Sequence, residues 1–587
     1  MTRLVHAARN RQHSRTTWLR AKALPRIVVI TIAATFAGGT GALAASVLAP
    51  LPASAASSQV WSGLGDGTKW TDPQNWVSKQ VPQNGDSVTI APIPTESAPN
   101  VIDMPAGMQL QDLTLTDSSL SGGDVTVAGN FSWNATLTSS TLTAPLTVEG
   151  DASFSGTGRE NSQAPMTFDS TAEIKGPGPL SIQDSGAAVT NNGTLTMSPG
   201  ATMQASACCV TPDELLNTGT VSMPTAGTAT VTGMNFDDQG AVSAGKGSLL
   251  DVTAGVGEFG PGAGISGGGT LQFDLGAHQT LATGVSVAAG STLTLAGNSE
   301  FFGPGTLIGG GKFFWTGGTI DGSLDVAKTI HTTISGTTTK TLTSPTTAPT
   351  ALTLRGATSL AGSGEVELTG TTTLSNLGTL TMKTGTTVGA GACCVSPENF
   401  SNGGTLIVAA GTGTATSSLL QFSNSGTDKV NSGTLAINSL GYKQTAGSTQ
   451  LAGGSITAAQ QMNISKGTLS GFGTITGSVL NAGTVAPSTT GGVLKITGGY
   501  NQTSTGTLSS VITGTTPGTK FGQLSVGGTA ALAGTLKAST GNGFVPAHGA
   551  SFAVLAYHAR SGMFGTVSGT PPYTASYTAT AANVVYP

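Results

Sequence analysis

A short motif recurs along this 587-residue chain and restricts what it can fold into. Asn-x-Gly-Thr-Leu/Val starts at six positions, at intervals of 26, 159, 26, 29 and 50: Asn191, Asn217, Asn376, Asn402, Asn431 and Asn481. Most intervals lie near multiples of 26, which predicts a solenoid with one coil per roughly 26 residues. Asn and Gly suit corners that need a left-handed backbone, Leu or Val points inward, and Thr points out.

A longer duplication lies on top of this motif. The segment Ala207-Cys-Cys-Val-Thr-Pro-Asp213 returns later in the chain as Ala392-Cys-Cys-Val-Ser-Pro-Glu398, and both copies follow Gly-Thr-Leu-Thr-Met. The chain therefore contains two related solenoid segments, which we assign to residues 101–290 and 291–465.

Composition favours strands throughout. Only 9% of the residues are charged and 86 are glycine, whereas 37% are hydrophobic. The apolar residues alternate with Thr and Ser, as in Leu113-Thr-Leu115, and period-two alternation is typical of β-strands. The apolar content argues against a disordered chain, and corner spacings near 26 favour a solenoid over an array of β-sandwiches. We predict an all-β, right-handed parallel β-helix with an N-terminal Trp-rich cap and a C-terminal closing β segment.

Residues 1–55 have the pattern of an export signal. Seven basic residues and no acid precede Ile27, an uncharged apolar run follows, and Ala53-Ser-Ala55 forms a small-residue cleavage site. An uncleaved membrane anchor is the alternative, because the apolar run is long enough to span a bilayer. We expect a secreted, extracellular protein with no membrane segment after signal removal.

Three of the six tryptophans, Trp61, Trp70 and Trp76, fall in residues 56–100. Compact aromatic side chains are one way to cover the open end of a solenoid, and we expect that role. Stacking on sugar rings is the alternative.

The chain resembles bacterial extracellular β-solenoids of the autotransporter-passenger and adhesin type. The resemblance rests on Gly-x-Phe-x-Trp at Gly129 and Gly311, and most specifically on residues 466–587, with Asn481-Ala-Gly-Thr-Val-Ala-Pro487 and Phe552-Ala-Val-Leu555. It implies that the last segment closes the solenoid and that a membrane β-barrel follows. No barrel sequence follows here, so we expect a plain secreted product.

Four cysteines in an exported protein raise the question of disulfides. With coils of roughly 26 residues the two pairs lie about seven coils, or about 34 Å, apart, so only sequence neighbours are close enough to bond. Vicinal disulfides Cys208–Cys209 and Cys393–Cys394 and buried free thiols are equally compatible with the sequence.

Catalytic residue types are scarce. Beyond the export signal the chain has three arginines and four histidines, and its best acid pair, Asp237-Asp238, has no acid at the matching position of the second copy. We expect a solvated turn there, no enzyme activity, no metal and no cofactor. The small number of basic residues also argues against nucleic-acid binding.

Charge is divided along the chain. All 28 acidic residues lie between Asp66 and Asp428, and the seven charged side chains that follow are all basic. We therefore expect a non-enzymatic, adhesin-like surface protein whose Thr- and Ser-rich faces bind a polysaccharide or another cell-surface ligand. The alternatives are a filament-forming envelope protein, whose basic C-terminal region holds an anionic envelope polymer or a neighbouring copy head to tail, and a carbohydrate-active β-helix enzyme.

Overall fold

The computed structural model describes residues 56–92, 100–137, 139–183, 186–205, 213–344, 349–391 and 398–587. Within these ranges the regular structure is β-strand, apart from one 3-10 turn, η1 (Pro73–Asn75). Ala56–Pro587 forms one compact unit. The export signal predicted for residues 1–55 lies outside the described residues.

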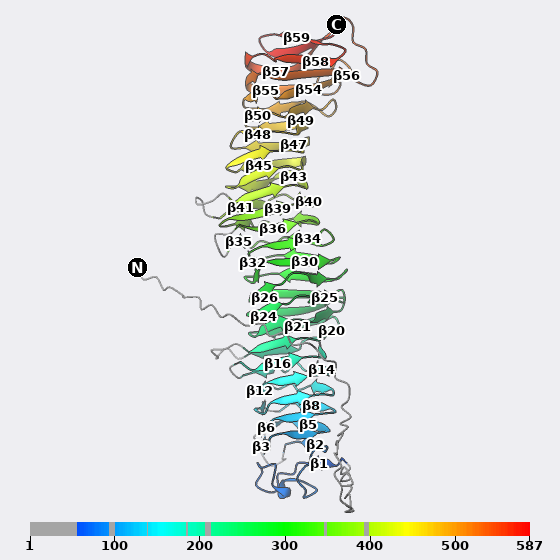
Figure 1. Cartoon of the computed structure of the whole chain (residues 1–587), viewed down its shortest axis with the longest axis vertical. Coiled ribbons are helices and arrows are strands. Elements are labelled where there is room, and N and C mark those ends of the chain that lie inside the picture. The colour runs from blue at the N-terminus through cyan, green and yellow to red at the C-terminus, as the bar shows by residue number, and fades with distance from the viewer. Residues whose placement is uncertain are drawn as a thin grey trace, which may run out of the picture. The chain divides into compact units, whose positions relative to one another are not determined.

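The strands form three parallel ladders, because each strand pairs with the one about three places further along the chain (Figure 1). Sheet 1 begins with β2 (Ser87–Ile90), β5 (Asp112–Thr116) and β8 (Phe131–Asn134). Sheet 2 begins with β3 (Asn100–Met104), β6 (Ser118–Gly122) and β9 (Ser140–Leu142). Sheet 3 begins with β4 (Met108–Leu110), β7 (Val125–Val127) and β10 (Leu146–Val148). The predicted all-β parallel solenoid is confirmed.

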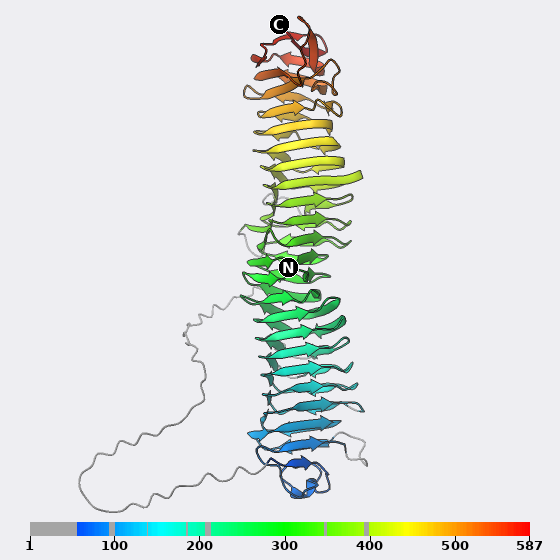
Figure 2. The same ribbon diagram turned by 90° about the vertical axis from the view of Figure 1, so that its right-hand side faces the viewer.

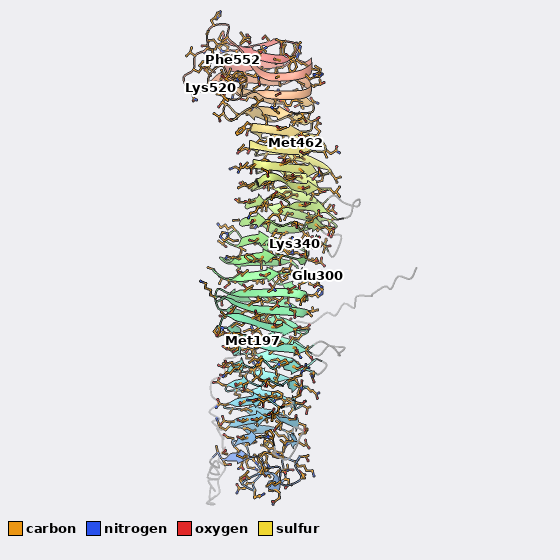
Figure 3. All side chains as sticks on the ribbon, turned by 180° about the vertical axis from the view of Figure 1, so that it is seen from behind. Met197, Glu300, Lys340, Met462, Lys520 and Phe552 are labelled. Carbon is orange, nitrogen blue, oxygen red and sulfur yellow. The ribbon has the colours of Figure 1, made fainter. Side chains whose placement is uncertain are left out.

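Period-two alternation places the core inside the coils. In β5, Leu113 and Leu115 are fully buried and the threonine between them is half-buried. Met197 and Met462, labelled in Figure 3, are buried in the same way on coils far apart in the sequence. Burying each such side chain contributes about 1.5–3 kcal/mol, so the core stabilises the stack along its whole length.

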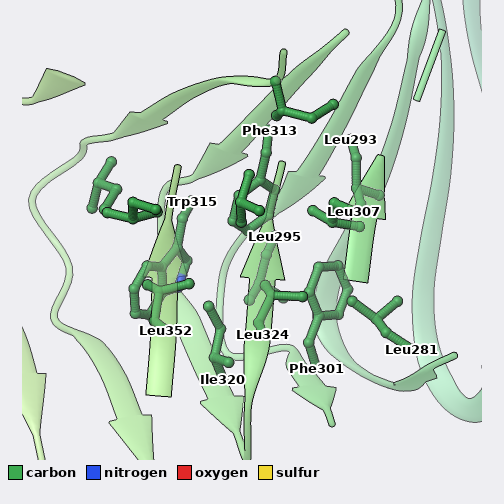
Figure 4. Packing of buried hydrophobic residues seen from close by; sticks show 14 of the residues in the cluster. Leu281, Leu293, Leu295, Phe301, Leu307, Phe313, Trp315, Ile320, Leu324 and Leu352 are labelled. Carbon is green, nitrogen blue, oxygen red and sulfur yellow. The ribbon is translucent and has the colours of Figure 1, made fainter. Parts of the chain in front are cut away.

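Aromatic residues fill the interior where sheets 2 and 3 meet (Figure 4). Phe301 of β29 (Glu300–Phe302) stacks on Phe313 of β31 (Lys312–Trp315), with ring centroids 6.3 Å apart. Trp315, also on β31, is fully buried. A large side chain on one sheet is thus accommodated by its neighbours on another sheet of the same or the next coil.

The predicted constant coil length is wrong as a general rule. Leu113 pairs with Phe131 and Met462 with Val479, which makes those coils shorter than predicted, whereas Tyr500 pairs with Ala530 in a longer one. A spacing of 26 does occur where Asn191 pairs with Asn217 and Asn376 with Asn402, and those two coils contain the cysteine segments. Corners absorb extra residues without changing the pairing of the strands, so sequence spacing does not measure coil length.

The asparagines of the recurring motif do not take a left-handed backbone, so that expectation is also wrong. Asn191 is fully buried, and its Nδ2 donates to Asn217 Oδ1 at 2.7 Å and to the Thr220 carbonyl at 3.0 Å. The glycine is needed for space. A Cβ on Gly404 would overlap the carbonyl oxygen of Gly378 in the coil before. At five of its six positions the motif therefore specifies a tight corner with a buried asparagine, whereas Asn431 is exposed within β45 (Thr427–Asn438).

Both ends of the stack carry segments that depart from the regular coil (Figure 2). At the N-terminal end, β1 (Ser58–Val60) pairs with β2, Trp70 N–H donates to the Asp103 carbonyl of β3, and Gly85 N–H donates to the Gln109 carbonyl of β4. At the C-terminal end, β60 (Ala581–Val585) runs antiparallel to both β57 (Ser551–Gly562) and β59 (Thr574–Tyr577). These strands form the predicted closing segment.

Candidate functional site

The three N-terminal tryptophans pack on one another. Trp61 is 5% exposed, and Trp70 and Trp76 are fully buried. Trp76 meets Trp61 and Trp70 edge to face, at centroid distances of 5.0 and 4.9 Å, and its Nε1 donates to the Trp70 carbonyl. A hollow of about 430 Å³ lies beside Trp70, but the ring is enclosed. No indole of the three presents an open face, which favours the covering role over sugar stacking.

A hydrogen-bonded turn holds these indoles in place. Asn75 Oδ1 accepts from the backbone N–H groups of Gly65 and Gly67, and Asn75 Nδ2 donates to Asp66 Oδ1. The N–H groups of Lys69 and Thr68 hold the pKa of Asp66 well below its usual range. The Asn75 and Asp66 side chains bond within this turn, so they serve the local fold rather than a ligand.

All four cysteines, Cys208, Cys209, Cys393 and Cys394, lie outside the described residues, and both alternatives for them remain predictions. The strands that flank them are described. β18 (Thr202–Ala205) belongs to sheet 2, whereas the equivalent strand of the second copy, β41 (Thr387–Ala390), belongs to sheet 3. The second copy is therefore turned by one sheet relative to the first.

This rotation of the second copy by one sheet follows from the length of the duplicated unit. β17 (Thr194–Met197) is in sheet 1 and its copy β40 (Thr379–Met382) is in sheet 2. Eight pairings of sheet 2 separate β18 from β40, a distance of about 38 Å. The offset between the copies thus equals eight coils and one further strand, rather than the seven coils predicted. The described strands on either side of each cysteine segment therefore belong to sheets 2 and 3 in the first copy and to sheets 3 and 1 in the second.

Asp237 and Asp238 do not form a turn or an acid pair. They are neighbours in β22 (Asn235–Asp238) and point to opposite sides of sheet 3. Asp238 is fully buried, accepts from Asn217 Nδ2 at 2.6 Å, and has its pKa raised by burial to about 6. Asp237 points outward and accepts from the Glu258 N–H at 2.7 Å. Since the two carboxyls face different surroundings, they cannot act on one bond.

A different pair of acids does meet on the outer face of sheet 3. Burial raises the pKa of Glu214, and the adjacent Asp237 carboxyl raises it further. Glu214 begins β19 (Glu214–Asn217), one coil before Asp237. The sequence alone does not reveal this pair, because its members belong to different coils and are separated along the chain. The register of neighbouring coils is the signal that finds it.

His278 and Glu300, also on sheet 3, pair with each other. His278 Nδ1 lies 2.9 Å from Glu300 Oε2, and its ring stacks on Phe302. Among the described residues, no three His, Cys, Asp or Glu side chains are placed together to hold a metal ion.

The basic residues of the C-terminal region are spread around the solenoid. Lys429 and Lys537 lie on sheet 2, Lys443 on sheet 1, and Lys495 on sheet 3. The predicted contact with an anionic polymer would therefore involve several faces at once.

Sheet 2 carries an outward column of hydroxyls in the C-terminal half. Nine successive strands of this sheet begin with Thr or Ser, and these first residues pair with one another from coil to coil. We call these nine residues the hydroxyl ladder. Its strands are β40, β43 (Thr405–Ser418), β45 (Thr427–Asn438), β47 (Ser448–Ala458), β49 (Thr468–Thr476), β51 (Thr484–Pro487), β54 (Thr507–Ile512), β56 (Thr535–Thr540) and β58 (Thr566–Thr570).

All nine hydroxyl-bearing residues are exposed or half-buried, so the ladder faces solvent. It extends over eight strand spacings, about 38 Å. Each rung follows a glycine, as Gly404 precedes Thr405, so no side chain stands beside the hydroxyls on that edge.

Comparison with protein-family models and with curated proteins finds no match for this sequence. The adhesin likeness therefore rests on the motifs alone. Among the described residues, no helix has the length and apolar character needed to cross a bilayer.

Proposed function

We propose that this protein is a secreted, non-enzymatic, adhesin-like surface protein that binds a polymer or a cell surface through sheet 2. The hydroxyl ladder is the observation that carries the proposal. Hydroxyls donate and accept hydrogen bonds, and repetition at about 4.8 Å offers the same contact many times to a repetitive ligand. Each contact is weak, but contacts made along one chain reinforce one another.

The scarcity of convergent catalytic groups supports a binding role over an enzymatic one. Glu214 and Asp237 adjoin each other, but no arginine or lysine in the described residues forms an ion pair with either. A polysaccharide lyase needs such a base close to its acids.

Self-association by strand pairing has little support at the N-terminal end. The first strands of all three sheets already bond to β1, to Trp70 or to Gly85 of the N-terminal Trp-rich cap. Head-to-tail filaments would therefore depend on side-chain charge, and would dissociate as salt is added.

A sedimentation assay with insoluble polysaccharides and whole cells tests the proposal on the full chain. Replacing Thr468, Thr484 and Thr507 with valine keeps their shape and removes three adjacent rungs. We expect the bound fraction to fall severalfold. Valine at Thr434, Thr457 and Thr476, on sheet 3 of nearby coils, is the matched control and should bind normally. Equal binding by both triple variants would refute the role of the ladder.

A further inference from the structure

A groove crosses sheet 2 in the first half of the solenoid, away from the hydroxyl ladder. It has a volume of about 440 Å³ and runs over β24 (Ser248–Phe259), β26 (Thr270–Leu281), β28 (Thr292–Leu295) and β31. Four neighbouring strands span about 14 Å. Gly268 and Gly269 form one edge, and a Cβ on Gly268 would meet no atom within 4 Å. The groove is therefore open at that edge.

The floor of the groove carries two hydroxyls without protein partners. Thr292 and Thr294 alternate with the core residues Leu293 and Leu295, so they belong to the outer face, yet they are only 8% and 6% exposed. Within the described ranges neither hydroxyl forms a hydrogen bond to the protein. Each hydroxyl oxygen keeps some contact with solvent, so both can bond to a ligand that enters the groove.

The walls add an oriented amide and an aromatic ring. Gln272 Nε2 lies 3.3 Å from Asp251 Oδ1 and 3.4 Å from Asp274 Oδ2, which directs the amide nitrogen towards these two carboxylates. Its Oε1 remains available to accept a hydrogen bond. Phe314, half-buried, lies at the other end of the groove beside Thr316.

We propose that this groove binds two or three neutral pyranose units of a polysaccharide, an inference that rests on the proposed function. A sugar ring has an apolar face suited to Phe314, and hydroxyls suited to Thr292, Thr294 and Gln272. Asp251 and Asp274 disfavour anionic sugars nearby. The lining contains no deep apolar pocket for the anchor side chain of a peptide.

Calorimetric titration of the full chain with soluble hexasaccharides tests this site. The probes are β-1,4-linked glucose, xylose, mannose and N-acetylglucosamine, with α-1,4-linked galacturonate as the anionic comparison. We expect at least one neutral hexamer to bind and galacturonate not to. Phe314→Ala should weaken binding about tenfold, and Thr294→Val about fivefold.

Two matched variants control for stability and for nonspecific effects. Phe302→Ala removes an equally half-buried outward ring from sheet 3, and Thr333→Val removes a hydroxyl one coil beyond Phe314 on sheet 2. Both should bind within twofold of the unmodified protein. Unfolding midpoints measured on all four variants separate loss of binding from loss of folding.

The same proteins are also tested by sedimentation with insoluble polysaccharides and cells. If the unmodified protein sediments but binds no neutral hexamer, or if Phe314→Ala and Thr294→Val bind hexamers normally, the groove proposal is wrong and the proposed function stands. Hexamer binding that Phe314→Ala abolishes, without any sedimentation, supports the groove and refutes polymer attachment. Preferential binding of galacturonate would overturn the assignment to neutral sugars.

Discussion

The two copies of the duplicated unit bury opposite charges at corresponding positions, one on sheet 2 and one on sheet 3. Glu160 begins β12 (Glu160–Ser162) in the first copy. Lys340, labelled in Figure 3, begins β35 (Lys340–Thr343) in the second. In both copies this strand comes just after the one that pairs with a Phe-x-Trp strand, β8 or β31. Glu160 is 1% exposed and Lys340 is fully buried. The corresponding position of the duplicated unit thus accepts either sign of charge.

Backbone groups provide the partners in both copies. Glu160 Oε1 accepts from the N–H groups of Gly156 at 3.0 Å and Ala135 at 3.4 Å. Lys340 Nζ donates to the carbonyls of Thr338 at 2.6 Å and Ser335 at 3.1 Å. Within the described residues, neither charge has an ion-pair partner. Backbone N–H groups point towards the buried side chain in the first copy, and backbone carbonyls do so in the second. This orientation of the peptide groups therefore decides which charge the interior tolerates.

Reversing one of these charges should have the largest effect. In Lys340→Glu a buried carboxylate would face two carbonyl oxygens, and we expect a loss of about 3–5 kcal/mol in the free energy of unfolding, measured by chemical denaturation. Lys312→Glu reverses an exposed charge on β31 and should cost less than about 0.5 kcal/mol. Equal losses in the two variants would show that the corner backbone does not discriminate charge.

The second-largest effect is expected in the pH dependence of stability, which should have opposite signs for Glu160 and Lys340. Burial raises the pKa of Glu160 from 4.5 to about 7. Between these values the unfolded chain has lost the proton that the folded chain keeps, so a rise in pH favours unfolding. The stability is present in full below about pH 4.5 and is lost as pH rises to about 7, by on the order of 3 kcal/mol.

Denaturation series from pH 4 to 8 measure this slope, and Glu160→Gln should flatten it. Asp238 and Asp428, whose pKa values burial raises to about 6 and about 7, should leave part of the slope in that variant. Burial lowers the pKa of Lys340, so its contribution has the opposite sign, with stability rising as pH approaches the ordinary lysine value. An unchanged slope in Glu160→Gln would show that Glu160 is not the source of this pH dependence.

The stacked glycines of the two copies should respond to substitution in the same way. A Cβ on Gly219 would overlap the carbonyl oxygen of Gly193, as one on Gly404 would overlap that of Gly378. We expect Gly219→Ala and Gly404→Ala to lose similar amounts, about 1–3 kcal/mol in denaturation experiments. Gly264→Ala is the control, because its Cβ would make only ordinary contacts at 3.6 Å. A large difference between the first two variants would mean that turning the copy by one sheet altered the corner.

The smallest effect is expected at a buried polar group that the backbone does not satisfy. Gln279 is fully buried, and neither its Nε2 nor its Oε1 has a partner in the described structure. Gln279→Met should therefore raise the free energy of unfolding by about 1 kcal/mol. Gln502 donates to the carbonyls of Gly506, Ala533 and Thr535, so Gln502→Met should have the opposite effect. Destabilisation by Gln279→Met would indicate a partner such as buried water.

Much of the fold could be predicted because its causes are local. Alternation such as Leu113-Thr-Leu115 specifies which side chains enter the core, and the motif beginning at Asn191 marks a corner. The candidate binding surfaces could be predicted less well from the sequence. The sequence predicts Thr- and Ser-rich faces in general, without saying which residues lie side by side. The ladder from Thr379 to Thr566 becomes visible only when strands of unequal spacing are placed in register.

The sequence by itself determined that strands with one apolar side wind into a parallel solenoid, since side-chain direction follows from backbone geometry within a few residues. Only the tertiary structure decided which residues become neighbours on its outside. Pairing joins Met462 to Val479 but Tyr500 to the more distant Ala530, because corner insertions vary the spacing freely. The turn of the second copy, the Glu214–Asp237 contact and the groove between Gln272 and Phe314 all depend on that long-range register.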